Sequence, residues 1–328
     1  MRKTILPWKV WSATKLELLL FRCPLSFCFN YVLKIKAPEG IEKVFGGAIH
    51  RMVEKFFTLK KGYKSEKSFT EAWKHYWWKE ILGKRPKEMI RVRNSADPEK
   101  FLATGINILR RFYWENIIYR KEGGLFLKPV VEERFSWILK GHRITGVKDR
   151  IQPFPNGEIE IWDYKTGLRK FTEEELRRDI QFTFYNLDHF KKFGRNPDRM
   201  LINYLFSGEQ INVPLRPKKD YEQLGRWLDE ATIYVENILQ PIFSTWKGFL
   251  FRWLNPEDIE RKYFSPRPGS FCRICDYEQI CREYYPKEPI REKWIKQELD
   301  KIGPDLGHVQ LDLPMPPPKV KRKRKPSW

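Results

Sequence analysis

Two aspartates and a lysine lie at the ends of two consecutive strands predicted near the middle of the chain. Asp149 lies in the predicted strand 146–150, and Asp163 and Lys165 end the strand after the turn at 156–157. Because side chains alternate along a strand, Asp163 and Lys165 project to one side, and a hairpin-like arrangement can bring Asp149 beside them. Carboxylates suit Mg²⁺ or Mn²⁺, which hold a phosphate and lower the pKa of a bound water that an ammonium group can orient. The pattern indicates metal-dependent phosphodiester hydrolysis.

A longer series of residues around these strands resembles a known family. Asp149, the D-Y-K-T-G segment at 163–167 and the Q-x-x-x-Y pair Gln181 and Tyr185 are similar in order and spacing to the motifs of RecB-like PD-(D/E)XK nucleases, which cut DNA with a divalent cation. The resemblance implies that Asp149, Asp163 and the backbone carbonyl of Tyr164 bind metal and that Lys165 activates water. It also implies that Gln181 and Tyr185, four apart on one helix face, flank the catalytic groove and help position DNA or the active site.

A histidine on an earlier predicted helix is a further candidate ligand. In the resembling family a histidine in a G-x-x-x-H context binds the metal, and Gly46 to His50 matches that context. Glu54 lies one helical turn beyond His50 on the same face, so it is a candidate acceptor for the imidazole. Taken singly, such residues are more often core histidines or surface ion pairs; their order along the chain favours a nuclease site.

A cysteine cluster near the C-terminus indicates a second metal centre. Cys272, Cys275 and Cys281 have the spacing C-x2-C-x5-C, which lets neighbouring sulfurs reach one centre, and Cys23 is the candidate fourth ligand. Iron-sulfur members of the same family, such as CRISPR-associated adaptation exonucleases and AddB-type nuclease domains, share this distribution. The resemblance therefore implies a 4Fe-4S cluster, with a structural zinc at the same thiolates as the alternative. Cys28 is left unassigned, as a buried thiol.

The elements that must position these residues change along the chain. Apolar residues at helical spacing predict a helical part over about 12–120, and short alternating runs predict an antiparallel meander over about 130–165. A capping box opens a predicted helix over 172–193, and a strand over 201–206 and a helix over 221–239 follow. The predicted fold class is α/β: a PD-(D/E)XK restriction-endonuclease-like core, with a small mixed sheet flanked by helices and a helical N-terminal part.

An iron-sulfur clasp is expected to join the N- and C-terminal segments of one domain. Linking Cys23 to Cys272 closes a loop over most of the chain and holds the N-terminal helices against the sheet. The prediction is one RecB-like nuclease domain over 1–285, a charged helical extension over 286–303 and a disordered Pro-rich basic tail over 304–328. Within the domain we expect the helical part at about 12–120, the catalytic core at about 128–245 and the cysteine cluster at 264–285.

Charge and apolar content limit the partners and the location of the chain. Lys and Arg number 63 against 42 acidic residues, a formal charge of +21 that favours nucleic acid as the partner. No apolar run approaches the length of a membrane span or a secretory signal, which predicts an intracellular protein of the cytoplasm or nucleoid with no membrane partner. The odd cysteine count, five, argues against a disulfide framework.

The expected function is a Mg²⁺- or Mn²⁺-dependent DNA nuclease, an exonuclease acting on single strands or ends in DNA repair, recombination, replication or defence. Two alternatives stay open: a catalytically silent nuclease-fold subunit that binds DNA or serves as a scaffold, and an iron-sulfur redox protein in which Asp163 is dispensable. Residues 310–314, Q-L-D-L-P, resemble the peptides by which bacterial replication proteins dock on the sliding clamp, which adds a protein partner to the expectations.

Overall fold

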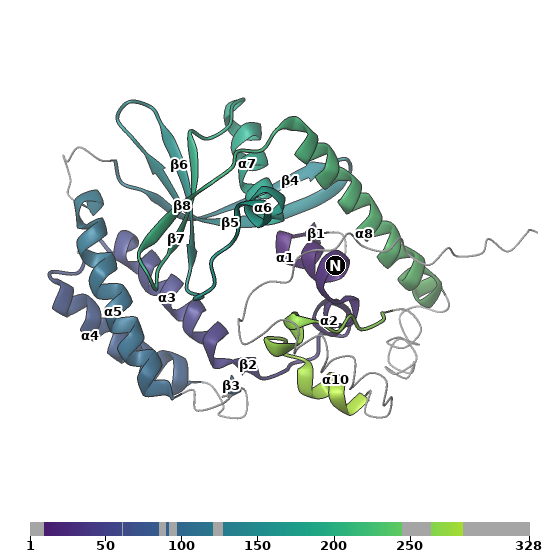
Figure 1. Ribbon diagram of the computed structural model, residues 1–328, viewed down its shortest axis with the longest axis horizontal. Coiled ribbons are helices and arrows are strands. Elements are labelled where there is room, and N and C mark those ends of the chain that lie inside the picture. The colour runs from purple at the N-terminus through teal and green to yellow at the C-terminus, as the bar shows by residue number, and fades with distance from the viewer. Residues whose placement is uncertain are drawn as a thin grey trace, which may run out of the picture.

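A mixed β-sheet with helices on both faces forms the body of the chain (Figure 1). The computed structural model describes residues 10–60, 62–84, 90–91, 97–120, 127–244 and 264–284. The predicted extension over 286–303 and tail over 304–328, with the peptide at 310–314, lie outside the described residues. No helix in the described part of the chain is long and apolar enough to cross a membrane.

The strands form one six-stranded mixed sheet and a separate two-stranded sheet. They are β1 (Val10–Trp11), β2 (Glu39–Gly40), β3 (Ile90–Arg91), β4 (Val130–Leu139), β5 (His142–Pro153), β6 (Ile159–Lys165), β7 (Arg199–Tyr204) and β8 (Glu209–Val213). The order in the large sheet is β1-β5-β6-β7-β8, and β4 also pairs with β5. The antiparallel pairing of β4, β5 and β6 confirms the predicted meander. β6 and β7 are parallel, because helices cross over between them.

The helices surround this sheet. They are α1 (Ala13–Glu17), α2 (Pro24–Phe27), α3 (Ile41–Thr58), α4 (Glu66–His75), α5 (Pro98–Asn116), α6 (Glu173–Arg178), α7 (Ile180–Phe193), α8 (Lys218–Ser244) and α10 (Glu278–Tyr284). Short π-helical or 3-10 segments extend or join them at Leu18–Arg22, Cys28–Val32, Tyr76–Leu82, Ile117–Arg120 and Ser270–Arg273.

The single helix predicted over 172–193 is two helices in the structure. The capping box at its start is confirmed, because the Thr172 and Glu175 side chains exchange hydrogen bonds with each other's backbone. Asp179 then adopts an extended conformation, with φ −65° and ψ 122°, which ends α6. Its carboxylate accepts from the backbone N–H of Phe182 at 3.1 Å and so begins α7.

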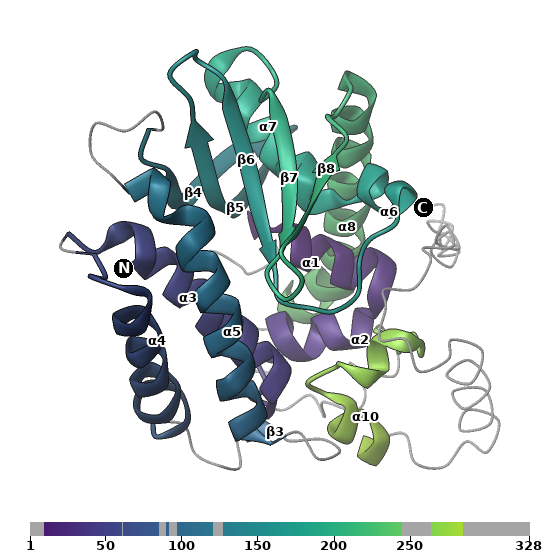
Figure 2. The same cartoon turned by 60° about the vertical axis from the view of Figure 1, so that its left-hand side comes forward.

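The two faces of the sheet bury separate hydrophobic cores. Because side chains alternate along β6, Ile161 lies in the core with α1, α2, α7 and α8, whereas Trp162 and Tyr164 lie in the core with α3, α4 and α5. Figure 2 shows these helix groups on opposite sides of the sheet, with α10 close to α2. The first and last described segments of the chain therefore lie together.

Candidate active site

The β4–β5 hairpin places two carboxylates opposite each other. A two-residue turn at 140–141, with positive φ at both positions, fixes the register so that Glu132 lies opposite Asp149. The alternation of side chains along β5 is interrupted between Lys148 and Arg150. Residues two apart on a strand normally share one face, but these two bind partners on α7 and α5, on opposite sides of the sheet. Glu132 has a φ of 53°, a conformation that costs a non-glycine residue about 1 kcal/mol or more and is often found at functional sites.

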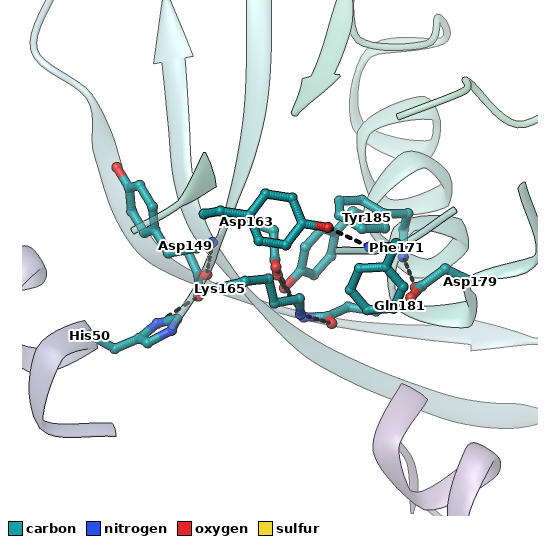
Figure 3. Close-up of polar contacts among 11 residues, drawn as sticks. His50, Asp149, Asp163, Lys165, Phe171, Asp179, Gln181 and Tyr185 are labelled. Carbon is teal, nitrogen blue, oxygen red and sulfur yellow. Dashed lines mark hydrogen bonds and ion pairs between the residues drawn. The ribbon is translucent and has the colours of Figure 1, made fainter. Parts of the chain in front are cut away.

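Three potential metal ligands meet beside this hairpin. One ligand atom each of His50, Glu132 and Asp149 lie within 4.8 Å of one another. His50 reaches the group from α3, with its Nδ1 atom 3.5 Å from Asp149 Oδ1 (Figure 3). Imidazole nitrogen and carboxylate oxygen are both accepted by Mn²⁺, and carboxylate oxygen by Mg²⁺. Glu132 was not predicted from the sequence.

Asp163 and Lys165 extend from the end of β6 toward α7. Lys165 Nζ lies 2.8 Å from Asp163 Oδ2 and donates to Gln181 Oε1 at 3.1 Å. Gln181 Nε2 in turn donates to Asp163 Oδ1 at 2.9 Å and to the Tyr185 hydroxyl at 2.6 Å (Figure 3). Tyr185 is buried, with 2% of its surface exposed, and the Gln181 and Tyr185 side chains hold Asp163 and Lys165 in place.

The group of potential ligands around Asp149 and the group around Asp163 are joined through the backbone of β6. The Tyr164 N–H donates to Asp149 Oδ2 at 2.7 Å, and Asp163 is the residue before it. Asp163 Oδ2 is buried and accepts no hydrogen bond from the described residues, apart from its ion pair with Lys165. A buried carboxylate oxygen with a free lone pair beside other carboxylates fits a cation ligand.

Neighbouring charges shift the pKa values of the group. Burial raises the pKa of Asp163 to about 6, although the Lys165 ammonium opposes the shift. Burial also raises the pKa of Glu132, and the Asp149 carboxylate adds to the increase. Burial alone would lower the pKa of His50, but the charge and hydrogen bond of Asp149, together with the charge of Asp163, outweigh it and the pKa is raised. Carboxylates that repel one another in this way are stabilised by a bound cation.

The partner predicted for the His50 imidazole is different in the structure. The Glu54 carboxylate, expected to accept from His50, binds the guanidinium of Arg51 on the same helix. Asp149 is the carboxylate beside His50. Arg51 lies only three residues before Glu54, so the local ion pair forms along the surface of α3.

Gly46 allows α3 to lie close to the loop that follows β6. A Cβ atom at Gly46 would lie 2.8 Å from Thr166 Oγ1, nearer than real contacts allow, whereas a Cβ at Gly47 would meet nothing within 4 Å. Gly46→Val should therefore displace α3 and His50 and lower the rate of the metal-dependent cleavage expected from the sequence about 10²-fold. Gly47→Val is the matched control in the same helix. Equal cleavage rates in the two variants would contradict this positioning role.

The four predicted cysteines line one cavity between the segments around α2 and α10. Cys23, Cys272, Cys275 and Cys281 line a space of about 120 Å³. Burial raises the pKa of Cys275 to about 11 and also raises that of Cys23, so both thiols are poor nucleophiles. Cys28 is fully buried in the neighbouring core. The N- and C-terminal cysteines thus line one common pocket.

Comparison with protein families gives a match over most of the chain. A family model described as the PD-(D/E)XK nuclease superfamily matches residues 10–282, which include every residue of the candidate site and all four cavity cysteines. Members of this superfamily are usually metal-dependent nucleases. No curated protein gives a match. The match spans most of the chain, and the mixed sheet flanked by helices is the fold predicted from the sequence. The chain belongs to the PD-(D/E)XK nuclease superfamily.

Proposed function

We propose that this chain is a divalent-metal-dependent deoxyribonuclease of the RecB-like branch, an exonuclease on single strands or DNA ends. The observation that carries the proposal is the meeting of His50 and Asp149 with Asp163 and Lys165 from separate elements, beside Glu132. The charge of +21 supports a polyanionic substrate. We take the nuclease to be a single domain over residues 1–285.

Each side chain has a defined task in this proposal. A divalent cation would be held by His50, Glu132, Asp149, Asp163 and the carbonyl of Tyr164. Mg²⁺ or Mn²⁺ bound there would polarise the phosphate and lower the pKa of a bound water. The Lys165 side chain, 27% exposed, orients the attacking water and stabilises the negative charge that builds on the phosphorane. Gln181 accepts a hydrogen bond from Lys165 and so holds its ammonium in place.

Glu132 is testable as a ligand. Glu132→Gln should lower Mn²⁺ affinity at least about tenfold, because a neutral amide replaces a carboxylate at the cation. Calorimetric titration of Mn²⁺ measures the change. Glu133→Gln is the matched control, since Glu133 binds Lys148 and Lys192 on the other side of the hairpin. Wild-type Mn²⁺ affinity in Glu132→Gln would exclude Glu132 from the metal site.

The affinity for Mn²⁺ should depend on pH. Burial raises the pKa of Asp163 to about 6, and the charge of Asp149 raises that of His50. The cation binds the deprotonated forms, so protons compete with it below these pKa values and the affinity rises as pH increases through them. Titrations between about pH 5 and about pH 8 should show this rise, levelling off once both groups are deprotonated. A flat profile would contradict it.

We further propose that the four cysteines hold a 4Fe-4S cluster. The cavity of about 120 Å³ supports a multi-atom group. A single Zn²⁺, bound directly by thiolates at about 2.3 Å, would need far less space. Iron and acid-labile sulfide should each approach about four per chain in protein purified without oxygen. Stoichiometric zinc without iron would favour the alternative.

Digestion of end-labelled DNA tests the nuclease proposal directly. Protein purified without oxygen is incubated with linear single-stranded and double-stranded DNA and with circular single-stranded DNA, in Mg²⁺, Mn²⁺ or EDTA. We expect metal-dependent shortening of linear single strands, with the circle resistant. Labels at the 5′ or 3′ end give the polarity of digestion. Metal-independent retardation of DNA in a gel, without cleavage in either cation, would instead indicate a catalytically silent DNA-binding subunit.

A further inference from the structure

One face of α3 reaches both candidate metal centres. Lys43, Gly46 and His50 follow one another at spacings of three and four residues, so they lie along one stripe of the helix. At one end of the stripe Lys43 binds Asp276, and at the other end His50 faces Asp149. With a rise of about 1.5 Å per residue, about 10 Å of rigid helix separates Lys43 from His50.

Asp276 contacts both the first turn of α3 and the strand β3. Lys43 Nζ donates to Asp276 Oδ2 at 2.7 Å. Arg91 donates from Nη1 to the Asp276 carbonyl at 3.3 Å, and Arg91 Nη2 lies 3.9 Å from Asp276 Oδ1. Arg91 pairs in β3 with Gly40 of β2, the residue that precedes α3. Asp276 therefore holds both the first turn of the helix and the strand pair before it.

The position of Asp276 is set by its neighbours in the chain. Cys275, which precedes it, lines the cysteine cavity and lies 3.7 Å from Ser26. Tyr277, which follows, donates its hydroxyl to the carbonyl of Ile35 at 3.2 Å. A cluster bound through Cys275 would fix the peptide at Asp276 and hence the carboxylate that Lys43 binds. Without the cluster, one of these two anchors is lost.

We propose that Asp276 couples the two metal centres, with Lys43 and Arg91 as positioning residues. Removal of the cluster loosens the segment 275–277, the start of α3 shifts, and the divalent-metal site loses affinity because His50 is held less closely at Asp149. The coupling is reciprocal, so a divalent cation bound at His50 slows the loss of the cluster. This inference rests on the proposed function, since it requires both centres to bind metal.

The test compares Mn²⁺ affinity in variants that retain their iron. Lys43→Ala and Asp276→Asn should bind Mn²⁺ about tenfold more weakly than the wild type, with unchanged iron content. The charge-swapped double variant, Lys43→Asp with Asp276→Lys, should recover Mn²⁺ affinity to within about threefold. Lys74→Ala, which removes an exposed 2.8 Å ion pair with Glu71 on α4, is the matched control and should bind Mn²⁺ normally.

Two further measurements separate coupling from general damage. In protein stripped of iron, Lys43→Ala should lower Mn²⁺ affinity no further, because the link is already broken. Saturating Mn²⁺ should slow removal of iron by a chelator in the wild type but not in Lys43→Ala. Thermal melting followed by circular dichroism establishes that each variant is folded.

The outcomes distinguish this inference from the proposed function. Wild-type Mn²⁺ affinity in iron-loaded Lys43→Ala, or iron loss that is insensitive to Mn²⁺ in the wild type, would overturn the coupling and leave the nuclease proposal standing. A wild-type protein that binds neither Mn²⁺ nor iron would overturn the proposed function, and the coupling with it.

Discussion

Replacing Lys165 by alanine should lower kcat/KM for metal-dependent DNA cleavage by about 10³-fold or more, because the ammonium that orients water and stabilises the phosphorane is removed. Asp163→Asn should lower kcat/KM at least as much, because a neutral amide replaces the carboxylate of a potential metal ligand. The two variants should differ in Mn²⁺ affinity. Lys165→Ala retains binding, whereas Asp163→Asn binds Mn²⁺ weakly. Quantitative digestion of labelled DNA, with parallel Mn²⁺ titration, measures both effects.

Lys170→Ala provides the comparison for the loss of one positive charge near the site. Lys170 forms an exposed ion pair with Glu209, away from Asp163. Its removal should change kcat/KM by no more than a few-fold, the size expected for a surface charge. Digestion by Lys165→Ala at the rate of Lys170→Ala would contradict the role given to Lys165.

Cys275→Ser should remove the iron and lower the melting temperature by roughly 10 °C or more. A cluster that ties Cys275 to Cys23 closes a loop of about 250 residues, and a constraint of that length is worth about 5 kcal/mol in the unfolding free energy. In a domain of this size each kcal/mol corresponds to about 2–4 °C. Iron analysis and thermal melting followed by circular dichroism measure the two effects on the same preparation.

Cys28→Ala is the control for losing a buried thiol without losing a cavity ligand. Cys28 is fully buried beside the cavity but does not line it. This variant should keep its full iron content and lose about 1 kcal/mol of unfolding free energy, the cost of replacing a buried side chain by a smaller one. Iron retained in Cys275→Ser, together with a melting temperature equal to that of Cys28→Ala, would refute the proposed clasp.

The sequence predicted those parts of the site that follow from local periodicity. Alternation within 159–165 and the turn before it were enough to place Asp163 and Lys165 on one side of a strand next to Asp149. The order of motifs also indicated His50, which the structure brings to Asp149. Helical spacing and the capping box predicted the start of α6.

Glu132 was missed because its placement depends on backbone geometry that periodicity does not reveal. The sequence did carry a signal, because Lys140 and Gly141 stand between two alternating runs and can form a two-residue turn. Both residues have positive φ, and the turn they form fixes Glu132 opposite Asp149. The positive φ of Glu132, however, interrupts the alternation of side chains from which strands are predicted. The end of α6 at Asp179 was missed for a related reason, since an aspartate within a helical pattern also fits a continuous helix.

Contacts between distant segments could not be predicted where no motif marks the two residues. β2 and β3 have two residues each, too few to show any periodicity, and their pairing depends on the tertiary fold. The ion pair between Lys43 and Asp276 joins residues 233 positions apart. Such contacts depend on the packing of the whole domain, so they were absent from the sequence prediction.

The meeting of Cys23 with the segment 272–281 has a consequence for biosynthesis. The ribosome makes the amino-terminal cysteine roughly 250 residues before its partners, which at about 5–20 residues per second is a delay of about 10–50 seconds. Throughout that interval a nascent chain lacks three of the four sulfurs. We therefore expect insertion of the proposed cluster to be a late event in synthesis, and the domain to gain its full rigidity only after Cys281 has been made.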